Sequence, residues 1–242
     1  MTGPAVLYTG SDGVAVITLN RPHARNAIDS TLAAGLTDAF TRAEADDAIR
    51  VIVVTGTDPA FCAGLDLKEF ARLKQPPAGA SAAISMAGQL AKPAIGAING
   101  PVMTGGLELA LGLDVLIASA RARFADTHAA VGILPGGGMT ARLPRAVGSR
   151  MAMEMSYTGR VIDADEALRI GLVNRVVPHD GLLPAVHAMA ATIASRDAAV
   201  LRELKKLYRV SNSQTLGEAL AHELRERDAR RSSGRGLIPS AD

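Results

Sequence analysis

The sequence predicts an α/β fold in which most strands pair in parallel. Short β-branched runs that end in turn residues alternate with segments whose apolar residues recur at helical spacing. Such alternation favours a parallel sheet covered by helices. The chain has 242 residues, 48% of them hydrophobic and 21% charged, which is enough to bury the core of one large globular domain.

The first elements are two strands joined by a helix. Residues 14–19 (VAVITL) and 51–56 (VIVVTG) are β-branched runs, and we expect both to be strands. Between them, residues 29–48 begin with an Asp/Ser start signal and continue with apolar residues at helical spacing. This segment is therefore predicted to be a helix that connects parallel strands.

The later elements divide the chain into a core and a helical end. Three more strands are expected, at residues 93–100, 114–119 and 172–178. From about residue 180 the strand signal disappears, and three helices are expected at residues 182–195, 198–210 and 215–231, followed by a loose tail at 232–242. We therefore predict a core over residues 1–196 and a helical region with a tail over 197–242.

Composition excludes several classes of function. The net charge of +2, the 3% of aromatic residues and the absence of Trp argue against a nucleic-acid partner. The single cysteine, Cys62, excludes an internal disulfide and a CxxC metal pair, and the five histidines lack ligand spacing, so no metal is expected. There is no signal-peptide pattern and no apolar run long enough to span a membrane, so we expect a cytoplasmic protein.

Two glycine-containing stretches, each following a predicted strand, are candidates for chemistry. They are residues 61–70 (FCAGLDLKEF) and 100–114 (GPVMTGGLELALGLD). Glycine lets backbone N–H groups approach a ligand, and two such donors meeting at one point form an oxyanion hole. The second stretch holds Glu108 inside an apolar run, where a charge without a partner is unfavourable. Turn formation and a structural ion pair are the alternative explanations for the glycines and for Glu108.

Six stretches in order resemble the crotonase superfamily, the enoyl-CoA hydratases and isomerases, over roughly residues 5 to 210. They are ITLNRPHARNAID, DPAFCAGLDLKEF, KPAIGAINGPVMTGGLELALGLDVLIAS, ARFADTHAAVGILPGGGMTARLPRAVG, MSYTGRVIDADEALRIGLVNRVV and the helical end. The resemblance implies a spiral of repeated ββα units with a C-terminal helical region. It also implies an enzyme that stabilises the enolate of an acyl-CoA thioester.

The resemblance assigns roles to particular residues. The N–H groups of Leu65 and Gly105 are expected to form the oxyanion hole, and Glu108 is expected to be the acid/base. Coenzyme A enters as part of the substrate, without a separate cofactor, and is expected along Arg25, Ala63, Asp66 and Leu67, with Arg25 near the phosphates. The acyl chain is expected to pass Leu67, Phe70, Met103 and Leu134, for which ordinary core packing is the alternative.

His128 departs from the family pattern. Hydratases of the family use two glutamates, and His128 occupies the position of the second. If it lies at a helix start, the helix dipole favours its neutral form, and a neutral imidazole can still give a proton to C2 while Glu108 activates water. A pocket-filling role for His128 is the alternative.

The leading hypothesis is hydration of a 2-enoyl-CoA, and the departure at His128 keeps other functions open. These are Δ3,Δ2-enoyl-CoA isomerisation, acyl-CoA binding without turnover, and a fold-keeping assembly subunit. A further rival is thioester hydrolysis by Thr104 and His128, for which no orienting acid is identifiable and Thr104 can instead cap a helix. The resemblance also implies a homotrimer or a dimer of trimers, with residues 197–242 packing across subunits.

Overall fold

The computed structural model describes residues 3–234, which fall into two compact units that divide between Arg196 and Asp197. The roles expected for them, an acyl-CoA-binding core and a trimerisation region, stay predictions. Residues 235–242 of the expected tail lie outside the described residues.

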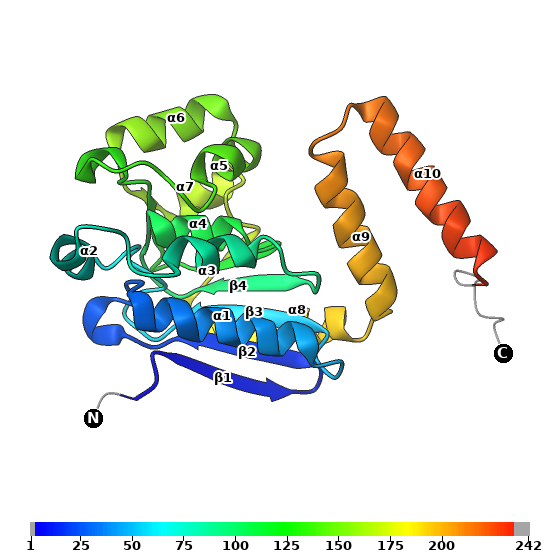
Figure 1. Cartoon of the computed structure of the whole chain (residues 1–242), viewed down its shortest axis with the longest axis horizontal. Coiled ribbons are helices and arrows are strands. Elements are labelled where there is room, and N and C mark those ends of the chain that lie inside the picture. Colours follow the sequence, from blue (N-terminus) through cyan, green and yellow to red (C-terminus); the bar gives the residue numbers. More distant parts are fainter. Residues whose placement is uncertain (1–2, 235–242) are drawn as a thin grey trace. The chain divides into compact units, whose positions relative to one another are not determined.

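A six-stranded sheet is the centre of the first unit, in the order β1-β2-β3-β4-β6-β9 (Figure 1). Its strands are β1 (Val6–Ser11), β2 (Val14–Leu19), β3 (Val51–Gly56), β4 (Ala94–Ile98), β6 (Val115–Ser119) and β9 (Arg175–Val177). Each strand from β2 to β9 pairs in parallel with its neighbour, whereas β1 pairs antiparallel with β2. The five strands predicted from the sequence are confirmed, and β1 was missed.

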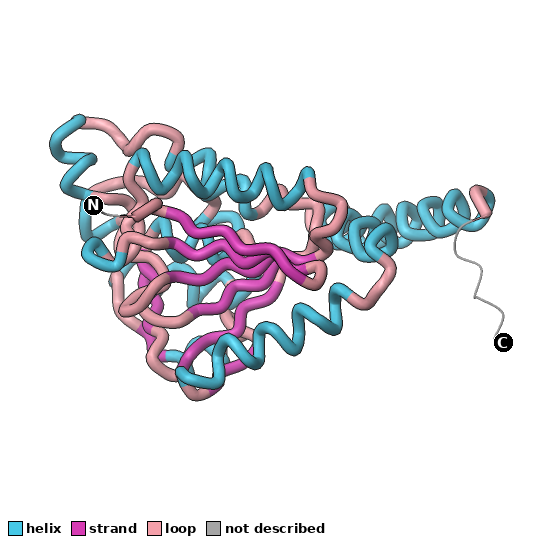
Figure 2. The backbone as a smooth tube through the Cα atoms, turned by 90° about the horizontal axis from the view of Figure 1, so that it is seen from below, coloured by secondary structure: helices cyan, strands magenta, loops and turns pink. Residues whose placement is uncertain are grey.

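Helices cover both faces of this sheet, as Figure 2 shows. On one face, α1 (Ser30–Ala45), α3 (Ala80–Ala87) and α4 (Gly105–Leu111) contribute to the larger apolar cluster. On the other face, α8 (Leu182–Ala194) packs Leu182, Val186 and Ala190 against a layer of strand residues. Burial of both faces explains why the central strands are continuous apolar runs rather than alternating ones.

A second, three-stranded sheet lies next to the glycine-containing stretches at residues 61–70 and 100–114. It contains β5 (Val102–Met103), β7 (Arg123–Ala125) and β8 (Ile162–Asp163), in that order. The remaining elements of the first unit are η1 (Pro22–Ala24), α2 (Leu67–Leu73), η2 (Ala129–Val131), α5 (Met139–Val147), α6 (Ser149–Thr158), α7 (Ala164–Arg169) and η3 (His179–Gly181).

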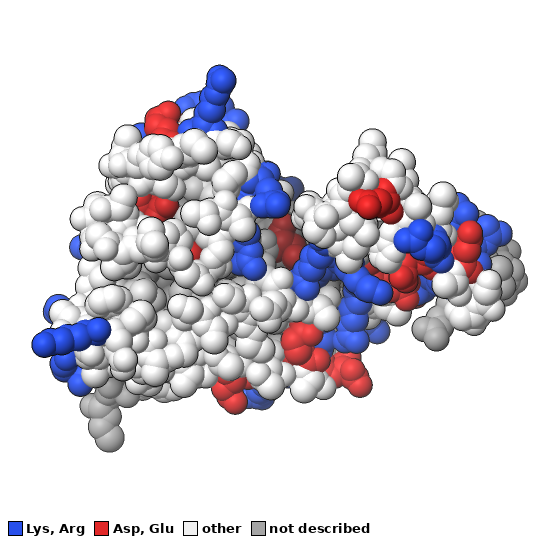
Figure 3. Space-filling model, turned by 45° about the horizontal axis from the view of Figure 1, so that its top comes forward, with Lys and Arg blue, Asp and Glu red and all other residues white. Residues whose placement is uncertain are grey.

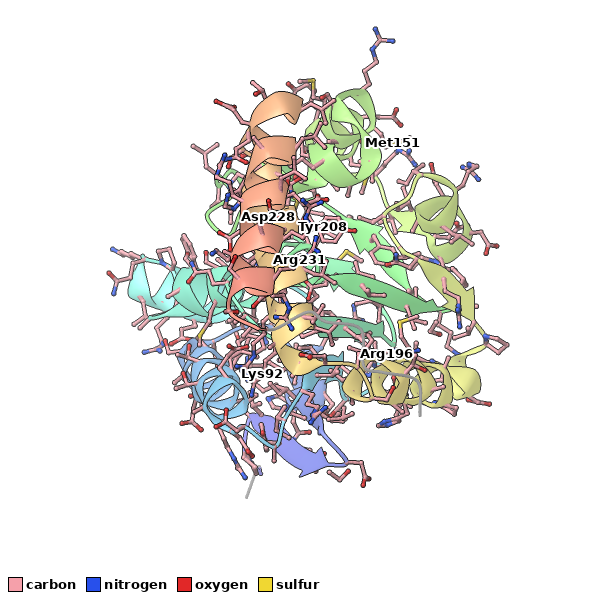
Figure 4. All side chains as sticks on the ribbon, turned by 90° about the vertical axis from the view of Figure 1, so that its right-hand side faces the viewer. Lys92, Met151, Arg196, Tyr208, Asp228 and Arg231 are labelled. Atoms are coloured by element: carbon pink, nitrogen blue, oxygen red, sulfur yellow. The ribbon has the colours of Figure 1, made fainter. Side chains whose placement is uncertain are left out.

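Both ends of α1 are capped by side chains. The Asp29 carboxylate accepts a hydrogen bond from Leu32 N at 2.7 Å, as the predicted start signal requires. At the other end, Lys92 (Figure 4) donates from Nζ to the carbonyls of Ala43 and Asp46, at 2.7 and 2.6 Å. A cation at a helix C-terminus also complements the helix dipole, so Lys92 is buried for a structural reason.

The second unit is a pair of helices, α9 (Ala198–Ser211) and α10 (Leu216–Ser232), which carry the labels Tyr208, Asp228 and Arg231 in Figure 4. Asp197 caps α9, and Thr215 with Glu218 forms a capping box at α10. Basic and acidic side chains are interspersed over this unit (Figure 3). The three C-terminal helices predicted from periodicity, α8 to α10, are confirmed. No helix within residues 3–234 is long and apolar enough to cross a membrane.

Cys62 is predicted to be unreactive in the folded protein. Its side chain is buried, and burial raises the pKa of its thiol to about 12, so almost no thiolate exists at pH 8. An aromatic disulfide reagent is therefore expected to titrate no thiol in the native protein and one thiol per chain in denaturant. Rapid stoichiometric reaction in the native state would contradict this packing.

Candidate active site

The glycine loop at residues 61–65 is joined to the strand that precedes α4. The N–H groups of Phe61 and Cys62 donate to the carbonyl of Pro101, at 3.1 and 3.2 Å, and Met103 N donates to the carbonyl of Cys62 at 2.9 Å. On its other side the loop receives a hydrogen bond from Ile28 N to the carbonyl of Gly64, at 2.7 Å. These bonds bring together two segments that lie about 40 residues apart in the sequence.

The N–H groups of Leu65 and Gly105 lie on either side of Gly64. A Cβ atom built on Gly64 would lie 3.3 Å from Gly105 N and 2.9 Å from the carbonyl oxygen of Met103, and a Cβ on Gly105 would lie 3.6 Å from Leu65 N. Gly64 also has a φ of +93°, which L side chains rarely adopt. Neither the Leu65 N–H nor the Gly105 N–H donates a hydrogen bond within the described chain. Two donors available at one place form the arrangement that an oxyanion hole requires.

Gly106 is needed for the same close packing. A Cβ built there would lie 2.3 Å from the carbonyl oxygen of Cys62, which is a backbone atom and cannot move aside cheaply. The glycine pair therefore allows the first turn of α4 to rest on the 61–65 loop, with the N–H of Gly105 beside that of Leu65.

Glu108 is fixed one turn into α4. Its side chain is 2% exposed, and Oε1 accepts hydrogen bonds from Gly137 N at 2.7 Å and Met139 N at 3.1 Å. Met139 begins α5, so the carboxylate lies at a helix N-terminus, where negative charge is favoured. Oε2 remains outside these two bonds and lies 3.8 Å from His128 Nε2. Oε1 therefore fixes the position of the carboxylate, and Oε2 is left facing His128.

The imidazole of His128 lies between two carboxylates. Its Nε2 faces Glu108, and its Nδ1 lies 2.6 Å from Oδ1 of Asp126. The other oxygen of Asp126 accepts a hydrogen bond from Ser156 Oγ at 2.6 Å. Burial alone would raise the pKa of Asp126, but the hydrogen bonds from His128 and Ser156 outweigh it, so the pKa lies below its ordinary value.

Asp126 corrects two expectations about His128. A helix dipole was expected to act on His128, but the helix that follows it, η2, has only three residues. The main charge beside the ring is instead the ionised carboxylate of Asp126. Asp126 is also an acid in direct contact with the His128 ring, and sequence reasoning did not find it.

Thr104 does not cap α4. Its φ of 50° is unusual for a β-branched residue, its side chain makes no capping bond, and its Oγ1 pairs with Oγ1 of Thr127. Thr127 N also donates to Thr104 Oγ1 at 3.3 Å. The hydroxyl is therefore engaged with Thr127 rather than with His128, which argues against a Thr–His dyad.

The residues expected along coenzyme A are brought together only in part. Arg25 is exposed, and its carbonyl accepts a hydrogen bond from Ala63 N at 3.0 Å. Asp66 N donates to the carbonyl of Ile28 at 2.9 Å, so the N–H groups of Ala63 and Asp66 are satisfied within the protein. A hollow of about 360 Å³ lies beside this loop and is lined by Arg21, His23, Ala24, Ala27, Asp66, Leu67 and Lys68.

The residues expected along the acyl chain differ in exposure. Phe70 and Met103 are partly buried, whereas Leu67 is 51% and Leu134 is 91% exposed. Leu134 follows η2 in an irregular segment, and its place along the acyl chain stays a prediction.

The Asp66 side chain has a structural role that predicts a pH dependence. It caps α2 by accepting from Lys68 N and Glu69 N, and it forms an ion pair with Arg21 at 3.1 Å. Burial raises its pKa, but the bonds from Glu69 N, Arg21 and Lys68 N together lower it below the ordinary value. A depressed carboxyl pKa stabilises the fold above the unfolded value of about 3.9, and this contribution is lost as pH falls through the folded pKa.

Asp66→Asn is therefore expected to cost roughly 1–2 kcal/mol of unfolding free energy at pH 7. The difference from wild type should shrink below about pH 4. Urea unfolding at several pH values measures both curves. A difference that stays constant down to pH 3 would contradict the assignment.

Four residues of the site were missed by sequence reasoning: Asp126, Gly137, Met139 and Ser156. The glycine run before α5 was an available signal, because it precedes a helix start with free N–H groups. Asp126 lies two residues before His128, and this proximity was also visible in the sequence. Ser156 comes from α6, 30 residues further on, and no local pattern marks it. Within residues 3–234, no group of His, Cys, Asp and Glu side chains is arranged to hold a metal ion.

Comparison with known proteins identifies the family of the chain. The sequence model of the enoyl-CoA hydratase/isomerase family matches residues 9–233. A probable enoyl-CoA hydratase of Mycobacterium leprae is 41% identical over 223 residues, which are 91% of this chain and 87% of that protein. The crotonyl-CoA hydratase of Syntrophomonas wolfei is 38% identical over 203 residues, which are 81% and 78% of the two chains.

Solved structures show the same fold. An enoyl-CoA hydratase from Mycobacterium avium has a TM-score of 0.77 at 45% identity and covers 95% of this chain and 99% of its own. An enoyl-CoA hydratase from Bacillus anthracis has a TM-score of 0.88 at 31% identity, covering 97% and 98%. The chain therefore belongs to the enoyl-CoA hydratase/isomerase family and has the crotonase fold. It is an enzyme of that family, which confirms the resemblance inferred from the six stretches.

Proposed function

We propose that this protein is an enoyl-CoA hydratase that adds water across the double bond of a 2-enoyl-CoA. The proposal rests mainly on the position of Glu108, which is buried and lies one helical turn after Gly105. Its Oε2 atom faces Nε2 of His128, and the N–H of Gly105 is available to a ligand. The N–H groups of Leu65 and Gly105 bind the thioester oxygen and stabilise the negative charge that develops there. Loss of one such donor typically slows turnover by about 10²- to 10³-fold.

The two side chains divide the proton transfers. Glu108 Oε2 accepts a proton from water as the hydroxide oxygen bonds to C3, and the electron pair of the double bond moves into the thioester enolate. The protonated Nε2 of His128 then gives its proton to C2, and the carbonyl reforms. Glu108 ends protonated and His128 neutral, and transfer of that proton from Glu108 to His128 restores the starting ion pair.

The hollow beside Asp66, Leu67 and Lys68 supports binding of coenzyme A as part of the substrate. Arg21, His23 and Lys68 supply basic side chains that suit phosphate groups, and Arg25 lies close to Arg21 and His23 in the sequence. Phe70 and Met103 are the acyl contacts that partial burial supports. No separate cofactor takes part in this reaction.

Cellular context follows from the same proposal. A cytoplasmic enzyme of fatty-acid breakdown, assembled as a homotrimer or a dimer of trimers, fits the single buried Cys62 and the exposed apolar side chains of the second unit. Exposed Leu204, Leu216 and Leu220 on α9 and α10 are the apolar surface that such assembly would cover.

A product analysis tests hydration against its rivals. A 2-enoyl-CoA and a 3-enoyl-CoA are each incubated with wild type and with His128→Ala, and the products are resolved by mass. Hydration predicts a gain of one water from the 2-enoyl-CoA, strongly reduced in His128→Ala. Double-bond migration in the 3-enoyl-CoA without water addition would instead identify an isomerase. Release of free coenzyme A would identify a hydrolase. A thioester that binds but is recovered unchanged would identify a non-catalytic acyl-CoA-binding protein.

A further inference from the structure

The buried carboxylate of Asp126 has no partner that explains it as a structural ion pair. Its residue is 1% exposed, and within the described chain no Lys or Arg forms an ion pair with it. Its hydrogen bonds come from His128, through both Nδ1 and the backbone N–H, and from Ser156. A buried charge without compensation is costly, so the contact with the His128 ring is central to its presence.

The bond from Ser156 directs Asp126 toward the ring. Ser156 Oγ donates to Oδ2, which leaves Oδ1 for the two bonds to His128. An ionised carboxylate only accepts hydrogen bonds, so the hydrogen in the 2.6 Å contact belongs to Nδ1 of His128. The proton on Nδ1 is thereby retained in both states of the ring, and only Nε2 gains or loses one.

We infer that Asp126 and Ser156 are positioning residues that hold His128 with Nδ1 protonated, so that Nε2 is the ring atom that exchanges protons beside Glu108. This inference rests on the proposed function for its catalytic consequence, but the state of the ring is a property of the protein alone. The titratable groups that face His128 are Asp126 and Glu108. From α6, Ser156 donates a hydrogen bond to Asp126 rather than to His128, and Glu154 of that helix pairs with Arg160.

Nitrogen NMR of the ring tests the inference without turnover. In protein labelled with ¹⁵N-histidine, the neutral wild-type ring of His128 is expected to show a protonated Nδ1 and an unprotonated Nε2. In Asp126→Asn the amide can donate to Nδ1, and the neutral ring should shift toward the tautomer with Nε2 protonated. A wild-type ring that is already Nε2-protonated when neutral would overturn the inference, whether or not the protein hydrates enoyl-CoA.

Kinetics test the consequence for catalysis. Asp126→Asn is expected to lower kcat for 2-enoyl-CoA hydration by about 100-fold or more, because the ring adopts the wrong tautomer. Ser156→Ala keeps the carboxylate and should lower kcat by roughly 3- to 10-fold with little change in KM.

A second Asp–His pair supplies the matched control. His179 Nε2 lies 3.1 Å from Asp58 Oδ2, away from Glu108. Asp58→Asn should alter the His179 signals alone and leave kcat and the His128 signals unchanged. If Asp126→Asn does not fold, Ser156→Ala carries the test. A kcat within twofold of wild type together with unchanged His128 signals in that variant would overturn the inference.

Discussion

Glu108→Gln is expected to lower kcat for hydration by about 10³- to 10⁴-fold while acyl-CoA still binds. The amide keeps the size of the side chain, and its Oε1 can still accept the hydrogen bonds from Gly137 and Met139 that hold Glu108 in place. What it loses is the oxygen that accepts a proton at the position facing His128. The expected loss is therefore one of chemistry rather than of folding.

Initial-rate kinetics with a 2-enoyl-CoA and calorimetric titration with a saturated acyl-CoA measure the two effects separately. Glu166→Gln is the matched control, because Glu166 lies on α7, forms an ion pair with Arg160 and has no place in the proposed site. Its kcat should equal that of wild type. A Glu108→Gln protein that retains more than a tenth of wild-type kcat would contradict the role of Glu108 as the acid/base.

Gly64→Ala is expected to have the second largest effect. The new methyl group would lie 3.3 Å from Gly105 N and 2.9 Å from the Met103 carbonyl oxygen, both of which are backbone atoms. The loop would have to move away from the start of α4, which separates the N–H groups of Leu65 and Gly105. We expect kcat to fall by about 10²- to 10³-fold, the loss that removal of one oxyanion donor produces.

Gly148→Ala separates this steric effect from backbone strain. Gly148 has a φ of +81°, similar to the +93° of Gly64, but a Cβ built there meets no atom within 4 Å. Both variants should lose roughly 1–3 kcal/mol of stability from strain, and only Gly64→Ala should lose turnover. Thermal unfolding and initial rates measure the two effects. Equal loss of kcat in both variants would show that strain, and not donor placement, is responsible.

The parallel strands and the long helices were predictable because each carries its own periodic pattern. Residues 14–19 and 51–56 coincide with β2 and β3, since strands buried on both faces are continuous apolar runs. β1 was missed because it is an edge strand whose residues are mostly exposed, so burial gives it no pattern. β5, β7 and β8 have only two or three residues each and are formed by tertiary pairing.

The candidate site could be predicted where its residues lie on the strand-to-helix turns. The two glycine stretches and Glu108 were found in this way, the family resemblance assigned Leu65 and Gly105 within those stretches, and the structure brings the stretches together. The partners that fix the charges come from other elements: Met139 begins α5, and Ser156 lies on α6. Their approach depends on how helices pack, which a single sequence does not display. The local charge at His128 was misjudged because a dipole was considered and the carboxylate two residues away was not.

The fate of solvent hydrogen tests the central claim most directly. Wild type is incubated with a 2-enoyl-CoA in D2O, and the product is analysed by mass and by proton NMR. Acid/base chemistry by Glu108 and His128 on a stabilised enolate predicts net addition of one D2O, with its oxygen at C3 and one deuterium at C2 of the 3-hydroxyacyl-CoA. An acyl-CoA that binds but emerges unchanged and without deuterium would contradict the account.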